Sequence, residues 1–186
     1  MKRIWVTGFR GFELGLFGNN DPKKTVLIYA LKRLLTREIE DGADWLITGG
    51  QMGIEQLALE AAIELKQEEP TFQTAMMLPF TDFGSQWNEA NQAKLAQLKT
   101  LVDFTANVSQ EKYSNPIQFR NYQTFMLEHT DAAILFYDEQ ATESTVKYTY
   151  AGLKQHAETK PYPITLVDFD RLQEFADEYA ETLQDW

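Results

Sequence analysis

The chain has 186 residues, of which 44% are hydrophobic and 24% charged, proportions that are ordinary for a globular protein with one well-buried core. Its formal net charge is −11, so no broad positive field attracts nucleic acid, and we expect no nucleic-acid partner. It contains no cysteine, which excludes disulfide bonds and thiolate metal sites. No apolar run reaches membrane-spanning length and the first residues lack a signal-peptide pattern, so we expect no membrane insertion and a cytoplasmic location.

The sequence predicts that strands and helices alternate along the whole chain. Runs of β-branched, aromatic and other apolar residues predict strands, and apolar residues at helical spacing predict helices. One helix has clear end signals, because Asp21 and Pro22 are typical of a helix start and Gly42 of a helix end. In chain order the predicted elements are strand 3–7, helix 22–41, strand 45–48, a helix from 54, strand 74–78, a helix containing Leu95, Leu98 and Leu101, strand 102–108, a helix from 116, strand 132–137, helix 147–157, strand 164–167 and helix 170–183.

Strands that are apolar throughout and alternate with helices indicate a mainly parallel sheet covered on both faces. We therefore expect residues 1–186 to form one Rossmann-like, doubly wound α/β domain with helices on both faces of the sheet. Ligands of such domains bind beyond the carboxyl ends of the strands. Here that edge would carry Thr7 and Gly8, the turn from Gly49 to Gly53, Pro79 and Phe80, and Asp138.

The most informative segment is GGQMGIE, which comprises Gly49, Gly50, Gln51, Met52, Gly53, Ile54 and Glu55. Glycines let backbone amides approach a ligand, and the N–H groups of the following helix favour an anion such as a phosphate. The alternative is a turn whose glycines serve only tight packing. A second glycine-rich turn, with Gly8 and Gly11, favours ligand binding. Neither turn is a Walker A loop or a G-x-G-x-x-G fingerprint, so ATP hydrolysis is unsupported.

Side chains near these turns could carry specific contacts. Glu55 either complements the helix dipole or contacts ribose hydroxyls, a metal or a glycosidic carbon. Arg10 and Arg120 are the best candidates for anion countercharge, although surface arginines are usually solvated. Trp87, in a polar loop after the third predicted strand, either stacks on a base or anchors the loop. No Ser-His-Asp set or metal-ligand spacing is visible, so we expect no metal.

Three segments together resemble the YpsA-like family of the SLOG superfamily, a Rossmann-like group that includes DprA and the LOG hydrolases. They are the opening IWVTGFRGFELG, the glycine-rich turn GGQMGIE and the segment NPIQFRNYQTFMLEHTDAAILFYD. The resemblance extends from Ile4 to about Val167 and implies a nucleotide-type ligand such as ADP-ribose or an NAD-like molecule. It also implies a regulatory role with a protein partner in cell division. By motif it points to Thr7, Gly8, Gly49, Gly50, Gln51, Gly53, Glu55, Arg120 and Asn121.

The chain departs from LOG hydrolases because it lacks their PGGxGTxxE signature; the corresponding region reads TVKYTYAGLKQHAE. Our leading hypothesis is therefore a nucleotide-binding sensor without turnover. The second is a nucleotide N-glycosidase with Glu55 as its catalytic carboxylate. The third is a protein-interaction module with a vestigial site. A homodimer is compatible with a small doubly wound domain, but no residue pattern demonstrates one.

Overall fold

The computed structural model describes residues 1–16, 21–141 and 143–184. Its described strands form one sheet in the order β4-β3-β2-β1-β5-β6, and every neighbouring pair is parallel. This arrangement confirms the predicted doubly wound α/β fold. The strands are β1 (Arg3–Gly8), β2 (Trp45–Thr48), β3 (Gln73–Leu78), β4 (Phe104–Asn107), β5 (Ala132–Phe136) and β6 (Ile164–Val167).

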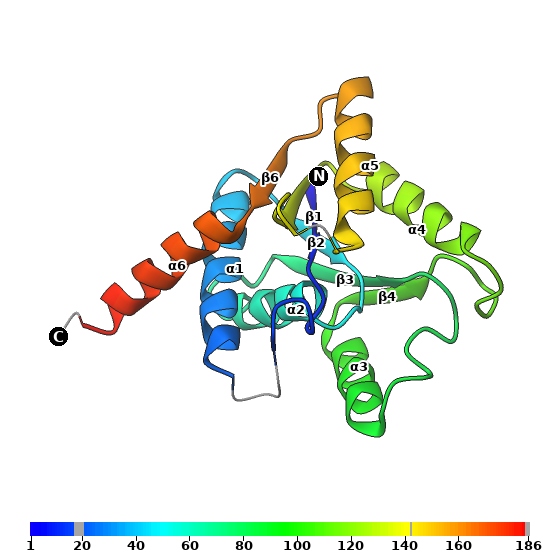
Figure 1. The fold of residues 1–186 in the computed structure, drawn as a ribbon, viewed down its shortest axis with the longest axis horizontal. Coiled ribbons are helices and arrows are strands. Elements are labelled where there is room, and N and C mark those ends of the chain that lie inside the picture. The colour runs from blue at the N-terminus through cyan, green and yellow to red at the C-terminus, as the bar shows by residue number, and fades with distance from the viewer. Residues whose placement is uncertain (17–20, 142, 185–186) are drawn as a thin grey trace.

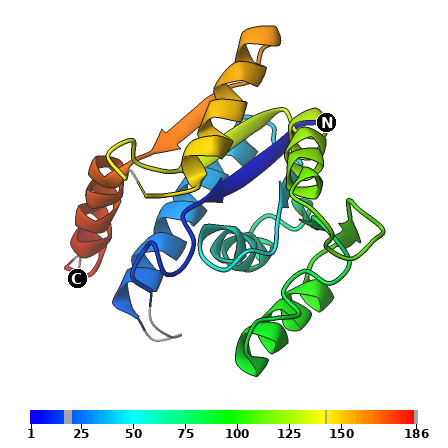
Figure 2. The same ribbon diagram turned by 45° about the vertical axis from the view of Figure 1, so that its right-hand side comes forward.

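Helices cover both faces of the sheet (Figures 1 and 2). They are α1 (Pro22–Glu40), α2 (Ile54–Leu65), α3 (Glu89–Leu101), α4 (Ile117–Glu128), α5 (Val146–Thr159) and α6 (Phe169–Thr182). The chain steps outward from β1 to β4, so right-handed crossovers place α1, α2 and α3 on one face. It then returns past β1 to β5, which places α4 and α5 on the opposite face (Figure 2). The last helix, α6, packs against α1.

The predicted end signals of α1 are confirmed. The Asp21 side chain accepts a hydrogen bond from the N–H of Lys23 at 3.0 Å, and Pro22 occupies the first turn. At the other end Gly42 adopts a φ of 96° and donates to the carbonyl of Ile39 at 2.9 Å. The N–H of Ala43 donates to the carbonyl of Glu38 at 2.8 Å, which completes a Schellman motif.

The centre of the sheet is buried on both faces, as near-continuous apolar strands predict. All five residues of β5 are buried, and so are the four central residues of β1. The edge strand β4 is shorter than the predicted strand 102–108 and is half exposed. The order of the strands reverses between β1 and β5, so the site expected in this fold lies at the carboxyl ends of the central strands. None of the described helices is long and apolar enough to cross a membrane.

Candidate functional site

A cavity of about 480 Å³ lies where the carboxyl ends of β1, β2 and β3 meet α4 and α5. We call it the first cavity. It contains seven of the predicted site residues, drawn from segments that are far apart in the chain: Thr7, Gly8, Arg10, Gly50, Gln51, Glu55 and Arg120. The other residues that line it are Trp5, Pro79, Phe83, Phe119, Tyr122, Gln123, Thr145, Val146, Tyr148 and Thr149. Its size is typical of a small-molecule site.

Glu55, in the first turn of α2, is the carboxyl group of this cavity. Its Oε2 accepts a hydrogen bond from the hydroxyl of Thr7 at 2.7 Å, and its Oε1 accepts one from the N–H of Gln51 at 3.0 Å. Burial raises the pKa of Glu55 above its ordinary value, although both hydrogen bonds and the charge of Arg10 act in the opposite direction. The group is therefore fixed in orientation and closer than an ordinary glutamate to exchanging a proton near neutral pH.

Tyr122, on α4, is a polar neighbour of Glu55 that the sequence did not reveal. Its hydroxyl donates to the carbonyl of Met77 at 3.0 Å. A Cβ at Gly49 would lie 2.3 Å from Glu55 Oε1 and 2.5 Å from the Tyr122 hydroxyl, so both oxygens converge on this glycine. Burial and the nearby charge of Glu55 hold the pKa of Tyr122 well above its usual value. Gly49 does not line the cavity itself, but its missing side chain makes room for the pair.

Two arginines at this cavity are available to a ligand. Neither Arg10 nor Arg120 forms a side-chain hydrogen bond or an ion pair with any described residue, although the chain carries a net charge of −11. Both are exposed and line the cavity, from the loop after β1 and from α4 respectively. Unpaired guanidinium groups at one cavity suit an anionic ligand, which they could bind through paired hydrogen bonds. The neighbouring Asn121 is exposed and does not line the cavity.

The amino-terminal end of α5 adds a second feature that favours an anion. Thr145, Val146 and Thr149 line the cavity from the first turn of this helix, which contains no acidic residue. The helix dipole is therefore not neutralised by a nearby carboxylate on the same turn. Trp5, which is 2% exposed, also lines the cavity, and its indole N–H finds no acceptor among the described residues. A buried donor without an acceptor lowers the stability of the folded protein, so a ligand that accepts a hydrogen bond here would gain binding free energy.

Two of the glycines predicted at the site, Gly53 and Gly8, let segments of backbone pack closely together. Gly53 has a φ of 107°, and a Cβ there would lie 2.5 Å from the carbonyl oxygen of Phe9 and 2.6 Å from the nitrogen of Gly11. The loop after β1 thus rests directly on the start of α2. Gly8 similarly leaves room for β5, because a Cβ at Gly8 would lie 2.4 Å from the carbonyl oxygen of Phe136. Gly53 and Gly8 therefore have a packing role, and the predicted contact of their backbone with a ligand stays a prediction.

The start of α2 is also less open to a ligand anion than the sequence suggested. The N–H of Ile54 donates to the carbonyl of Phe9 at 3.0 Å, and the N–H of Gln56 donates to the carbonyl of Gln51 at 3.2 Å. The carboxylate nearest this end of the helix is Glu55 itself. A ligand anion would therefore meet Arg10, Arg120 and the start of α5 rather than the start of α2.

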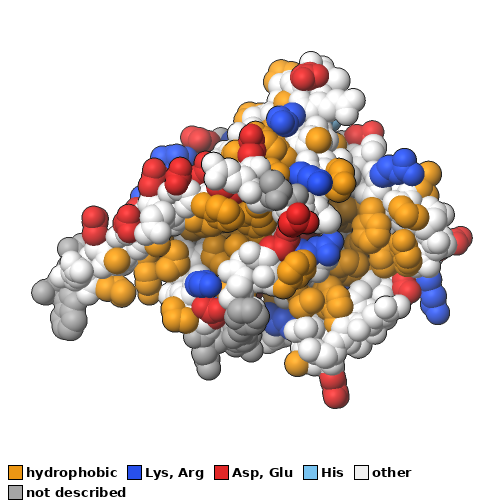
Figure 3. Space-filling model, viewed as in Figure 1, with side chains coloured by type: hydrophobic (Ala, Val, Ile, Leu, Met, Phe, Trp, Pro, Cys, Tyr) orange, Lys and Arg blue, Asp and Glu red, His pale blue; other side chains and the backbone are white. Residues whose placement is uncertain are grey.

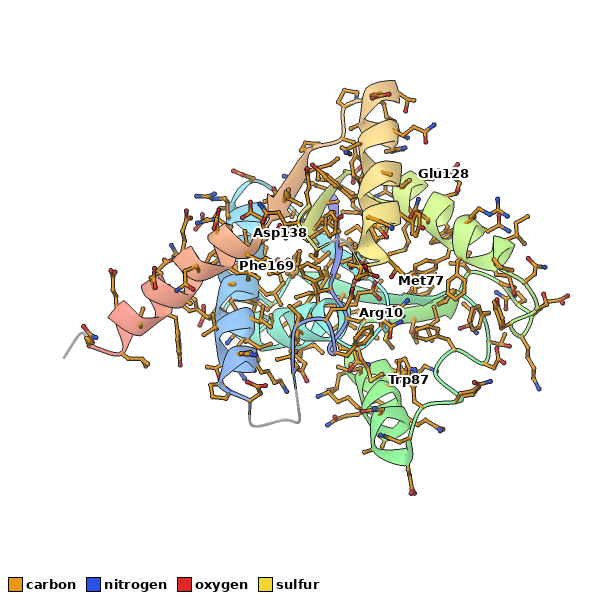
Figure 4. The ribbon with its side chains drawn as sticks, viewed as in Figure 1. Arg10, Met77, Trp87, Glu128, Asp138 and Phe169 are labelled. Carbon is orange, nitrogen blue, oxygen red and sulfur yellow. The ribbon has the colours of Figure 1, made fainter. Side chains whose placement is uncertain are left out.

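Two other residues predicted near the ligand edge lie outside the first cavity. Trp87 packs edge-on against Phe83, with ring centroids 5.3 Å apart, and lines a separate cavity that also contains Gly53. Figure 4 places Trp87 and Arg10 in the same part of the molecule. Asp138 accepts hydrogen bonds from the N–H of Gln140 at 2.8 Å and of Phe169 at 3.0 Å, so it fixes the start of α6. Among the described residues no group of three His, Cys, Asp or Glu side chains is placed to hold a metal ion.

Comparison with known proteins identifies the family. The family model described as the YspA SLOG family, or YpsA, matches residues 4–172. A UPF0398 protein of Leuconostoc citreum (strain KM20) is 50% identical over 97% of this chain and 95% of its own length. Those of Lactiplantibacillus plantarum and Levilactobacillus brevis are 52% and 51% identical over the same shares. The chain therefore belongs to the YpsA family of SLOG proteins, as its motifs predicted.

Proposed function

We propose that this protein binds a small nucleotide-type ligand, such as ADP-ribose or an NAD-like molecule, in the first cavity. The observation that carries the proposal is the pairing of Glu55, a partly buried carboxyl group, with two arginines whose side chains have no hydrogen-bond or ion-pair partner among the described residues. Arg10 and Arg120 supply positive charge in a chain whose net charge is −11. A ligand that combines hydroxyl groups with a phosphate would satisfy both features.

Each part of such a ligand has a matching part of the cavity. Arg120 and the start of α5 would hold a phosphate, because both favour negative charge. Glu55 and the indole N–H of Trp5 would contact ribose hydroxyls, which can donate to a carboxylate and accept from an N–H. The apolar side chains of Phe83 and Phe119 line the same cavity and offer surface for a base.

The role we propose is regulatory. The first cavity contains a carboxyl group but no Ser-His-Asp set among its lining residues, and the LOG signature is missing from the start of α5. The role in cell division that the sequence resemblance implies would suit a sensor that changes its interaction with a protein partner when the ligand binds. The proposal predicts binding without turnover.

A second candidate function is hydrolysis of an N-glycosidic bond, and the raised pKa of Glu55 favours it. In this reaction water adds to C1′ of the ribose while the bond from C1′ to the base nitrogen breaks and the base leaves with a proton. Glu55 would transfer that proton or stabilise the positive charge that develops on the sugar, and Arg120 would position the phosphate.

A thermal-shift screen tests binding. The purified protein is heated with AMP, ATP, ADP-ribose, NAD and cyclic dinucleotides, beside Arg120→Gln and the control Lys99→Gln. Lys99 is exposed on α3 and lines neither the first cavity nor the cavity of Trp87. We expect one ligand to raise the melting temperature of the parent and of the control. Arg120→Gln should lower the affinity for this ligand about tenfold, because a charge-assisted hydrogen bond is lost.

The same mixtures decide between the two candidates. Chromatography after incubation detects free base or ribose phosphate, and Glu55→Gln is run as the variant. An unchanged ligand supports the sensor, whereas release that stops in Glu55→Gln supports hydrolysis. If no ligand shifts the parent protein, both proposals are wrong and the interaction-module hypothesis replaces them.

A further inference from the structure

A second cavity, of about 730 Å³, lies on the other side of the loop that follows β1. It is bounded by the starts of α1 and α3 and by the first half of α2. The residues of interest there are Arg10, Lys24, Gln51, Glu60, Trp87 and Lys94. Two of them, Arg10 and Gln51, also line the first cavity, so the two cavities are neighbours that share these side chains.

The second cavity is positively charged in an acidic protein. Arg10, Lys24 and Lys94 line it, and Glu60 is the only carboxylate among the described residues that do so. Glu60 forms ion pairs with both lysines, with Lys24 at 3.4 Å and also with Lys94. One carboxylate neutralises only one of the two lysines, and the charge of Arg10 adds to the excess. The surplus favours a negatively charged group in this cavity.

Trp87 supplies a rigid aromatic surface beside these cations. It is half-buried, packs edge-on against Phe83 and lies over Gly84, where a Cβ would come within 3.1 Å of the indole ring. The side chain is therefore held in place while it lines the cavity. An aromatic ring next to lysines is suited to a ligand that joins a planar ring to an anionic group, as a nucleotide does.

We infer that the two cavities form one bipartite site for a two-ended ligand, a dinucleotide with one nucleoside in each cavity and its phosphates held by Arg10 together with Arg120. The inference rests on the proposed function, which places the ligand in the first cavity; it adds that the second half of the ligand occupies the second cavity. Among the described residues, Arg10 is the cation that lines both cavities. Trp87 stacks on the second ring, and Lys94 attracts the linking phosphates.

Isothermal titration calorimetry with NAD and AMP tests the inference, because NAD contains AMP as one half. We expect the parent protein to bind NAD at least tenfold more tightly than AMP. Trp87→Leu and Lys94→Gln should each lower the affinity for NAD about tenfold and leave the affinity for AMP unchanged. Trp87→Phe should retain most of the affinity for NAD. The control Lys99→Gln lies on the same helix as Lys94 and should match the parent. Lys94→Gln keeps the test valid if Trp87→Leu does not fold.

The outcomes separate this inference from the proposed function. If the parent binds NAD and AMP equally, or if Trp87→Leu and Lys94→Gln weaken both probes alike, the bipartite site is wrong while nucleotide binding in the first cavity stands. If neither NAD nor AMP binds, while the screen finds another nucleotide that depends on Arg120, the inference fails and the proposed function survives. If no nucleotide binds at all, the proposed function fails.

Discussion

The glycine-rich turns and the charged side chains occupy the same edge of the sheet but have different roles. Gly8 and Gly53 allow segments of backbone to approach one another, since a side chain at either position would overlap backbone atoms. The side chains of Arg10 and Arg120, in contrast, have no hydrogen-bond or ion-pair partner among the described residues, and they line a cavity. The glycines make the motif recognisable, and the side chains around it provide the means to bind a ligand. A glycine-rich motif can therefore mark a site whose charged and polar contacts come from other residues.

The largest expected effect comes from Gly53→Ala, which tests the packing role. The new Cβ would overlap backbone atoms of the loop after β1 at a φ of 107°, so we expect a loss of about 3 kcal/mol in the free energy of unfolding. Gly42→Ala is the matched control, because Gly42 has a φ of 96° but no atom within 4 Å of its Cβ position. It should lose only about 1 kcal/mol, the cost of the backbone conformation.

Urea unfolding of the two variants measures this difference. Equal losses would mean that the loop after β1 moves away from α2 at little cost, and the distinction between packing glycines and binding side chains would fail. A large loss from Gly53→Ala also means that this position cannot be used to test ligand binding, because a lost signal would report unfolding. Arg120 is the better probe, because it is exposed and its side chain has no hydrogen-bond or ion-pair partner among the described residues.

A smaller effect is expected from Tyr122→Phe, which removes one hydroxyl from the cavity. The carbonyl of Met77 loses its donor at 3.0 Å, so we expect the free energy of unfolding to fall by about 1 kcal/mol. Tyr148→Phe is the control, since Tyr148 lines the same cavity but is 66% exposed. Urea unfolding checks both variants. An unchanged stability in Tyr122→Phe would show that water replaces the hydroxyl and that the convergence on Gly49 is not a structural requirement.

Local patterns were sufficient to predict the elements and the edge on which the site lies. The start of α1 at Asp21 and Pro22 and its end at Gly42 depend on a few consecutive residues. The placement of Glu55 at the carboxyl edge follows from a strand-turn-helix sequence in a parallel sheet. Such features are local in the chain, so a single sequence carries them.

Contacts between distant segments could not be predicted in the same way. The sequence shows Tyr122 as one of several apolar positions at helical spacing, and nothing nearby reveals that its hydroxyl reaches Met77, 45 residues earlier. The need for a glycine at position 53 likewise depends on a distant segment, because the carbonyl oxygen of Phe9 lies where a side chain would start. The family resemblance points to Asn121 together with Arg120 as a pair, but adjacent residues on a helix face different directions, and Asn121 does not line the cavity.

The smallest expected effect is a change in how stability depends on pH. Because burial raises the pKa of Glu55 in the folded protein, the folded state holds a proton that the unfolded state releases above its ordinary pKa of about 4.3. The free energy of unfolding therefore falls as the pH rises from this value through the raised pKa. Glu55→Gln cannot titrate, so it should lack this decline and be more stable than the parent at neutral pH.

Urea unfolding of the parent and Glu55→Gln at a series of pH values between about 4 and 8 measures this difference. The gap between the two should widen across the titration of Glu55 and then stay constant. Glu158→Gln, which removes an exposed carboxyl group from α5, corrects for the change in net charge. A gap of the opposite sign at neutral pH would mean that Thr7 and the N–H of Gln51 stabilise the carboxylate more than burial destabilises it. The carboxyl of Glu55 would then be an ordinary anion, and the raised pKa that favours hydrolysis over simple binding would be lost.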